Sequence, residues 1–279
     1  MKNISIRKAI GLCYLGLSFL SVFSAFSLSK AIETFASSPF MPLFVVLVIC
    51  SFLCFLSFIL WIITDLLITR YLGYLVSFCF LVMIFFGIFF NNKFGYGFED
   101  LKIIPFLLSI IAFSSLFSYS KIAFVDKKQK HEEIETLDSD MLFESAGKNK
   151  KLFYFWTINK IYCITLATFS LPFLLMAMYS SNFSTTISYW EVPSLFANVF
   201  TVLFWLKPKW ARMIFIVLSS IALVLGIILI LAFTFGYAAL RTEGLLAVLG
   251  ICMLILGLIL ILLSKEAQAE LKAFENKKD

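Results

Sequence analysis

Residues 213–237 of this chain read MIFIVLSSIALVLGIILILAFTFGY, and this stretch decides the fold class. It contains no charged residue, and its most polar side chains are hydroxyls. A helix of about 20 mostly apolar residues is long enough to cross the hydrocarbon core of a bilayer, which is about 30 Å thick. The stretch therefore predicts a transmembrane α-helix that is long enough to tilt.

Seven other stretches have the same apolar character, and together they predict an all-α, polytopic transmembrane helix bundle with about eight spans. Helices are expected because lipid offers no hydrogen-bond partner to the backbone, and the short alternating segments of a barrel are absent. The sixth stretch is the least certain span, since its fully apolar core Val192–Leu206 is short enough for a re-entrant segment. The seven stretches are Ala9–Leu28, Met41–Ile63, Tyr71–Phe90, Ile103–Ser120, Ile161–Tyr179, Tyr189–Leu206 and Leu245–Leu263.

The composition of the 279 residues agrees with a membrane protein. Hydrophobic residues make up 61% and charged residues 14%, with a mean hydropathy of +0.98. Soluble domains have about 45–50% apolar and about 25% charged residues. The net charge of +6 does not indicate nucleic-acid binding, because the basic residues flank the apolar runs and form no single patch.

The distribution of Lys and Arg predicts the orientation. With the N-terminus inside, 19 of the 23 basic residues lie on the inner side, and the outer side has only Lys30, Lys93, Lys102 and Arg241. The positive-inside rule then places both termini in the cytoplasm, and we expect the bacterial inner (plasma) membrane. An alternative makes the first stretch a cleavable signal ending near Ser27–Ser29, although its apolar run is long for a signal core.

The chain divides into four parts on this interpretation. Residues 1–125 form a first four-helix half, and residues 152–264 form a second four-helix half. A charged cytosolic linker, 126–151, joins them, and it is either a solvated connection or includes a short amphipathic helix. Residues 265–279 form a cytosolic tail that extends as a helix, with Ala267, Leu271 and Phe274 on one stripe.

Several residues recur between the two halves and suggest a parallel four-plus-four internal repeat. The letters Phe-Gly-Tyr occur at 94–96 and 235–237, and Arg70 and Arg212 precede them by 24 and 23 positions. Proline and tryptophan also recur in the second and sixth stretches, at Pro42 and Trp61 and at Pro193 and Trp205. The spacing of the last four differs between the halves, so chance similarity of Phe-rich segments remains an alternative.

No catalytic, metal or nucleotide motif is found. The single histidine, His131, lies in the linker with Glu135 one helical turn away, which is too few ligands for a closed metal site. The sequence has no Gly-rich phosphate loop, His-Glu-x-x-His or Gly-x-Ser-x-Gly. The six cysteines lie inside apolar runs, where Cys packs as a small apolar residue. We therefore expect no enzyme activity, no metal and no cofactor.

Mild polar residues within the spans are the candidate site. Their functional interpretation is a solute path at the interface of the two halves, and their structural interpretation is hydrogen bonding between close helices. Asn198 is the most polar side chain in the middle of any span, since the charged Glu191 lies near the start of the sixth stretch. The solute-path candidates are Ser18, Ser21 and Ser24 in the first span, Thr165 and Thr168 in the fifth, and Asn198 and Thr201 in the sixth.

Two functions remain open from the sequence. The first is a multi-pass membrane protein that transports or binds a neutral or amphipathic solute between its halves. The second is a non-transporting membrane partner, such as an immunity, accessory or assembly protein. Expected partners are the lipid bilayer and a membrane protein or a second copy, but not nucleic acid. A polar cavity between the halves favours the first function, and a bundle filled by Phe and Leu favours the second.

Overall fold

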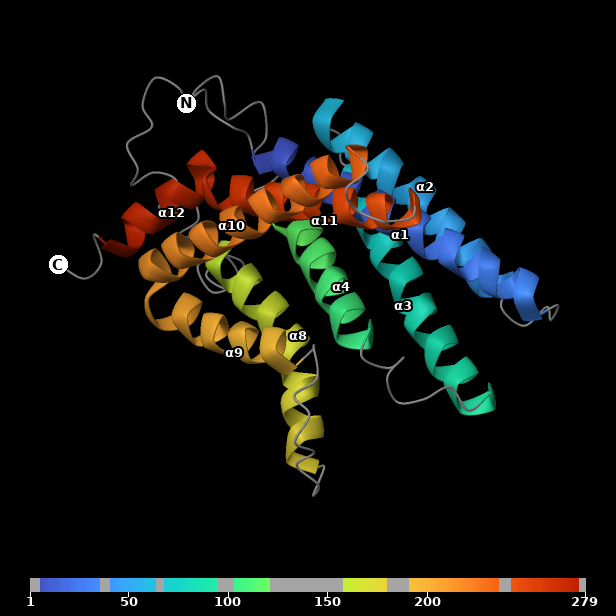
Figure 1. Cartoon of the computed structure of the whole chain (residues 1–279). Coiled ribbons are helices and arrows are strands. Elements are labelled where there is room, and N and C mark those ends of the chain that lie inside the picture. The colour runs from blue at the N-terminus through green and yellow to red at the C-terminus, as the bar shows by residue number, and fades with distance from the viewer. Residues whose placement is uncertain are drawn as a thin grey trace.

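The computed structural model describes residues 6–35, 41–63, 68–94, 103–120, 158–179, 191–235 and 242–275. Every regular element in these ranges is an α-helix (Figure 1). The helices are α1 (Ile6–Phe35), α2 (Met41–Ile63), α3 (Ile68–Phe94), α4 (Ile103–Tyr119), α8 (Ile158–Tyr179), α9 (Glu191–Leu206), α10 (Pro208–Thr234), α11 (Thr242–Leu262) and α12 (Lys265–Glu275).

The prediction of an all-helical membrane protein is confirmed. Within the described ranges, α1, α2, α3, α10 and α11 are long and apolar enough to cross a bilayer. The apolar parts of α4, α8 and α9 are shorter, and α9 has 16 residues, so it rises about 24 Å. The predicted bounds of the second stretch coincide with those of α2. The linker 126–151 lies outside the described residues.

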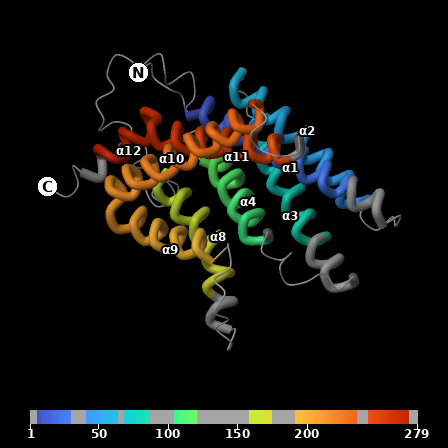
Figure 2. Tube along the Cα trace, viewed as in Figure 1, coloured from blue at the N-terminus to red at the C-terminus, as the bar shows by residue number. Residues whose placement is uncertain are grey.

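The eight apolar helices pack in a closed order. Each helix contacts the next one along the chain, from α1 to α4, then α8 to α11, and α11 packs against α1. Figure 1 shows α1 beside α2 and α11, and the tube in Figure 2 shows α4 between α3 and α8. The two halves of the chain therefore meet at two junctions, α1–α11 and α4–α8.

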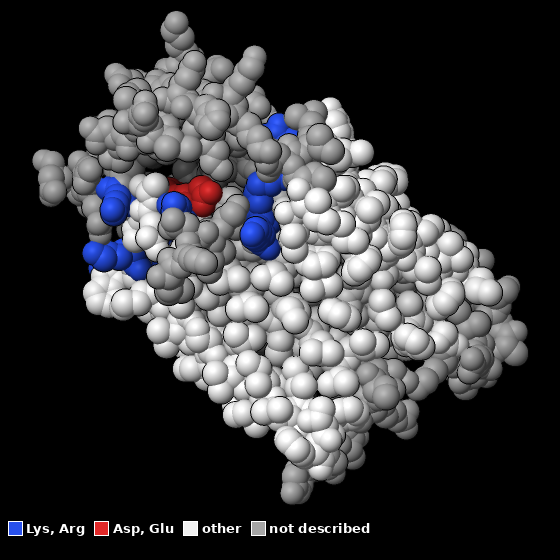
Figure 3. Space-filling model, turned by 90° about the horizontal axis from the view of Figure 1, so that it is seen from above, with Lys and Arg blue, Asp and Glu red and all other residues white. Residues whose placement is uncertain are grey.

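Charged side chains gather at one end of this arrangement. In Figure 3 the lysines and arginines in view lie together, while the rest of the described surface on that side carries no charge. Two contacts between a cation and an aromatic ring show which helix ends meet there. The Arg7 guanidinium lies 5.2 Å from the centroid of the Trp61 ring, and the Lys160 ammonium lies 6.0 Å from that of the Trp205 ring. We call it the charged end. The starts of α1 and α8 and the ends of α2 and α9 are there.

The helices differ strongly in burial. The core includes Ile10 and Tyr14 of α1, Phe117 of α4, and Phe204 of α9. By contrast, α10 carries no charged residue after Arg212 and exposes large apolar side chains along most of its length. A helix with apolar side chains on every face is surrounded by lipid or protein, because exposing that apolar surface to water is unfavourable. This exposure is consistent with direct contact with bilayer lipids.

Glycines set the close approach at the α1–α11 junction. A methyl group at Gly16 would lie 2.6 Å from the carbonyl oxygen of Gly250, and one at Gly257 would lie 2.9 Å from the carbonyl oxygen of Ala9. Small residues let helix backbones approach closely in membranes, where packing replaces the hydrophobic effect as the force between helices. The junction is therefore a tight backbone contact.

Candidate functional site

The first-span serines lie on the α2 side of α1. Ser18 donates its hydroxyl to the carbonyl oxygen of Ser51 in α2 at 3.1 Å, and Ser51 Oγ returns a bond to the Ser18 carbonyl at 3.4 Å. Ser21 is also buried, while Ser24 is half-buried and bonds to the Leu20 carbonyl of its own helix. Among the described contacts of these three residues, only that of Ser18 is a side-chain hydrogen bond to a second helix.

The candidate threonines of the second half donate their hydroxyls to carbonyl oxygens of their own helices. Thr165 donates to the carbonyl of Ile161, and Thr201 donates to the carbonyl of Ala197, both at 2.8 Å. Thr168 similarly donates to the Thr165 carbonyl. Such bonds satisfy a hydroxyl without a partner from another helix.

Asn198 lies half-buried on α9, which also carries Thr201, and α9 packs against α8, which carries Thr165 and Thr168. The two packed helices α8 and α9 are joined near Asn198 by a Cys163 Sγ contact of 3.6 Å with the Thr201 carbonyl oxygen. The candidates of the second half therefore lie on neighbouring helices, whereas Ser18 is bonded to α2. The described contacts do not bring the two sets together.

Both junctions between the halves are packed. The α1–α11 junction is held by glycine backbones, as described above. At the α4–α8 junction, Ser109 donates its hydroxyl to the Thr165 carbonyl at 3.1 Å and also to the Pro105 carbonyl of its own helix. This Ser109 contact is a helix–helix hydrogen bond of the kind that the structural interpretation of the polar residues anticipated.

A groove of 460 Å³ lies within the first half instead, between α1 and α2. Its walls are mostly apolar, and the Ser18–Ser51 pair supplies polar groups to it. Several of its aromatic walls are exposed, with Phe52 66% and Phe26 51% accessible. Ligand sites in proteins measure about 300–1,000 Å³. The lining residues are Ser18, Val22, Ala25, Phe26, Ser29, Phe44, Val48, Ser51, Phe52 and Phe55.

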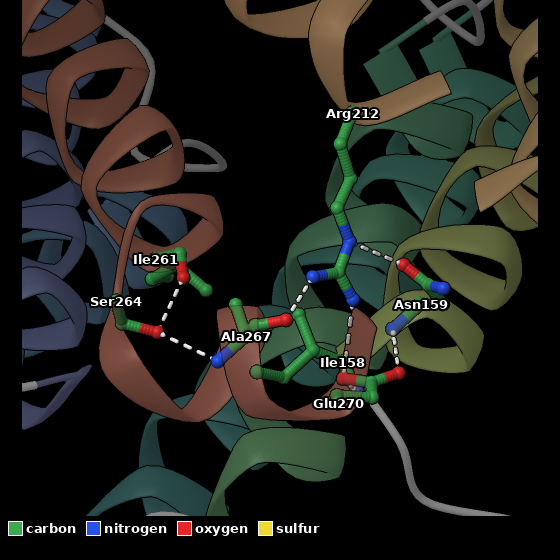
Figure 4. Close-up of polar contacts among 7 residues, drawn as sticks. All are labelled: Ile158, Asn159, Arg212, Ile261, Ser264, Ala267 and Glu270. Atoms are coloured by element: carbon green, nitrogen blue, oxygen red, sulfur yellow. Dashed lines mark hydrogen bonds and ion pairs between the residues drawn. The ribbon is translucent and has the colours of Figure 1, made fainter. Parts of the chain in front are cut away.

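A buried ion pair occupies the charged end of the second half (Figure 4). Arg212 of α10 is 4% exposed, and its Nη2 lies 3.2 Å from Oε2 of Glu270 in α12. The Nε of Arg212 donates to Oδ1 of Asn159 at 2.8 Å, and Nη1 donates to the carbonyl oxygen of Ala267. One guanidinium thus joins α8, α10 and α12.

The Glu270 carboxylate also binds the first turn of α8. Its Oε2 accepts the backbone N–H of Ile158 at 3.1 Å, and its Oε1 accepts that of Asn159 at 3.2 Å. The first N–H groups of a helix have no partner within the helix, and the helix dipole favours an anion there. Ser264 caps the start of α12, because its hydroxyl oxygen accepts a hydrogen bond from the backbone N–H of Ala267.

The charged end of the first half uses hydroxyls. Tyr14 of α1 and Ser114 of α4 share a hydrogen bond of 2.5 Å. Ser114 donates to the carbonyl of Gly73 in α3 at 3.2 Å, and Ser77 donates to the same carbonyl at 2.9 Å. Gly73 permits this approach, since a methyl group there would lie 1.9 Å from Ser118 Oγ.

A tyrosine in the second half makes matching contacts. Tyr14 stacks on Trp61 near the end of α2, with ring centroids 6.4 Å apart, and Tyr162 stacks on Phe204 near the end of α9, at 5.3 Å. The Tyr162 hydroxyl donates to a carbonyl of α11, as Tyr14 bonds to α4. In the stacking contact, Phe204 takes the place that Trp61 has in the first half, whereas in the contact with a cation Trp205 corresponds to Trp61.

Three polar residues that one described ion pair and its hydrogen bonds connect, Asn159, Arg212 and Glu270, are not among the sequence-predicted site residues. In the sequence, Arg212 is only a flanking cation and a marker of the possible repeat. A signal was present: the letters Ser-Lys-x-Ala-x-x-Asp at 120–126 recur as Ser-Lys-x-Ala-x-x-Glu at 264–270. This recurrence marks the acidic residue that follows the fourth helix of the second half.

The part of the chain that the structure describes contains no cluster of three or more His, Cys, Asp or Glu side chains suited to a metal ion. The expected absence of a metal, a cofactor and an enzyme activity stays a prediction. Comparison with known proteins gave no match to a family model, to a curated protein or to a solved structure.

Proposed function

We propose that this protein is an eight-span membrane protein, built from two equivalent halves, that binds and moves an amphipathic molecule bearing an alkyl chain. The groove between α1 and α2 carries the proposal. Its aromatic and aliphatic walls suit a chain of methylene groups, and the Ser18–Ser51 pair offers hydroxyl and carbonyl oxygens to a polar group. Such a site combines an apolar lining with a few polar groups that fix orientation.

The closed order of helices supports two equivalent halves. The α1–α11 junction joins the first helix of one half to the last helix of the other, and α4–α8 is the same pairing in reverse. Ser114 and Leu258, the partners of the two stacked tyrosines, are 144 positions apart, and so are Ser120 and Ser264. Equal spacing along the fourth helices is expected if one half arose from a copy of the other.

The arrangement of charges supports the orientation. Lys8, Arg70, Lys160 and Lys209 belong to the helix ends that the positive-inside rule assigns to the cytoplasm. With the charged end in the cytoplasm of a bacterial inner membrane, the groove lies in the outer part of the first half. An amphipathic molecule would then enter it from the bilayer, through the exposed faces of Phe26 and Phe52.

Photolabelling of the groove tests the binding step. The purified protein in nanodiscs is exposed to a single-chain phospholipid with a photoactivatable group on its alkyl chain. We expect labelled peptides from α1 and α2, and a several-fold loss of labelling in Val48→Trp, because the indole fills the groove. Ser51→Ala removes the hydroxyl without filling the groove and should weaken labelling less.

The matched control places the same substitution on another lipid-facing helix. Val224 of α10 is 55% exposed and Val48 of α2 is 46% exposed, so Val224→Trp adds the same indole away from the groove. Labelling should be unchanged in Val224→Trp. Equal labelling of both variants and the unmodified protein would rule out the groove as the binding site. Flux of the same lipid in proteoliposomes then tests whether binding leads to movement.

A second candidate function rests on α10. Val224, Leu225 and Ile228 are each more than half exposed, and no charged residue follows Arg212 in this helix. This long apolar helix suits a membrane-protein partner, which would make the chain an accessory or assembly protein. A photoreactive residue at Leu225 should crosslink a specific protein in native membranes, and recovery of lipid adducts alone would argue against it.

A further inference from the structure

The charged end of the second half combines three features of an oxyanion-binding site. The first is the N-terminus of α8, a 22-residue helix whose first two N–H groups converge on one carboxylate. The second is the Arg212 guanidinium, which is almost completely buried. The third is the oxyanion itself, since Glu270 is already seated against both (Figure 4). Helix N-termini bind carboxylates and phosphates by the same means.

Arg212 requires an anion at this position. Its guanidinium stays protonated in proteins, so it cannot become neutral when buried. Asn159 and Ala267 accept hydrogen bonds from it through neutral oxygens, and Glu270 supplies the negative charge. A buried ion pair that loses one partner leaves an uncompensated charge, which is strongly destabilising.

Glu270 reaches the site from a short helix. α12 has 11 residues, and isolated helices of this length are marginal in water. The described contacts that attach it to the rest of the second half include the carboxylate of Glu270, the carbonyl of Ala267 and the Ser264 cap, and Ala267 is also buried in the core. Glu270 supplies the one charged contact described between α12 and Arg212, so the affinity of the site for a carboxylate contributes to the position of α12.

We propose that the α8 N-terminus and Arg212 form an oxyanion site that the chain fills with its own Glu270, so that α12 is a tethered and releasable ligand. The chemical class that it binds is a carboxylate or a similar oxyanion. A free carboxylate occupies the site when Glu270 is absent, and α12 is then no longer held. This inference does not depend on the groove between α1 and α2.

Chemical rescue tests the site. In Glu270→Ala, we expect the apparent melting temperature of the detergent-solubilised full chain to fall by several degrees. Sodium formate should raise it again in a saturable manner, beyond the effect of sodium chloride at the same ionic strength. Adding Arg212→Met to Glu270→Ala should abolish the formate effect. Glu266→Ala, which removes another carboxylate from α12, should show no formate-specific rise.

A distance measurement tests whether Glu270 holds α12 in place, independently of whether the site binds formate. Spin labels at Lys160 on α8 and Lys272 on α12 should give a narrow distance distribution in the unmodified chain and a broad one in Glu270→Ala, with or without formate. If Glu270→Ala does not fold without formate, Glu270→Gln serves instead, and it should show a smaller loss and a smaller rise. No formate-specific rise in either variant, or an unchanged distance distribution, would overturn the proposal.

Discussion

The two halves of the molecule stabilise their charged ends with different chemistry. In the first half, Tyr14 and Ser114 connect α1, α3 and α4 by neutral hydrogen bonds. In the second half, Arg212 and Glu270 connect α8, α10 and α12 by an ion pair. The helix order is the same in both. The same packing order of helices is therefore compatible with different polar networks, and the second half depends on a guanidinium charge that cannot be neutralised.

The largest difference between the halves is expected at the two arginines. Arg212→Ala leaves a buried carboxylate without its cation, and we expect a loss of about 3–5 kcal/mol in stability. Arg70 is half-buried and donates to the Ser120 carbonyl at 3.5 Å, so Arg70→Ala should cost less than about 1.5 kcal/mol. Thermal unfolding of both variants in the same detergent gives the comparison.

Equal losses at the two arginines would contradict the distinction between Arg212, which is buried in an ion pair, and Arg70, which is half-buried and bonds to a carbonyl oxygen. A double variant tests whether the loss in Arg212→Ala comes from the unpaired carboxylate. Arg212→Met combined with Glu270→Met removes both charges at once, and buried ion pairs are often replaced by apolar residues at little cost. The double variant should therefore be more stable than Arg212→Ala.

The two junctions between the halves give the next largest difference. Gly16→Ala at α1–α11 places a methyl group against the Gly250 backbone, and we expect a loss of about 1–3 kcal/mol from overpacking. Ser109→Ala at α4–α8 removes one hydrogen bond to Thr165, which should cost about 1 kcal/mol. Unfolding midpoints measure both, and a larger loss for Ser109→Ala would refute the tight-backbone account of α1–α11.

The smallest effects should come from the two tyrosines, and here the halves should agree. Tyr14→Phe and Tyr162→Phe each keep the stacked ring and remove one hydroxyl bond to the fourth helix. A loss of about 1 kcal/mol is expected for each. The same unfolding assay tests this, and clearly unequal losses would count against equivalent roles in the two halves.

The sequence predicted the helices better than it predicted their contacts. Apolar length alone located α2 to the residue, because a span is decided by composition over about 20 positions. The spacing of hydroxyl side chains along one helix does not say which neighbouring helix each side chain faces. Ser18 bonds to Ser51, which lies 33 positions away and was not a candidate.

The ion pair of Arg212 and Glu270 could not be predicted from the apolar pattern of the helices. They lie 58 positions apart, and their pairing depends on the turn between α11 and α12 at Ser264. Flanking cations look alike in sequence whether they face water or a buried carboxylate. When the two halves are aligned at Ser120 and Ser264, Glu270 falls opposite Asp126, and this is the sequence signal for the acidic residue.

Cysteine labelling from one side of the membrane tests the eight-span topology and the cytoplasmic position of the charged end. In a chain without native cysteines, single cysteines replace Met41 and Glu191 at one end, and Lys8, Lys209 and Lys272 at the charged end. A membrane-impermeant maleimide should label the first two positions in intact cells and the other three only after permeabilisation. Labelling of Glu191 and Lys209 positions from the same side would show that α9 does not cross, and would contradict the account.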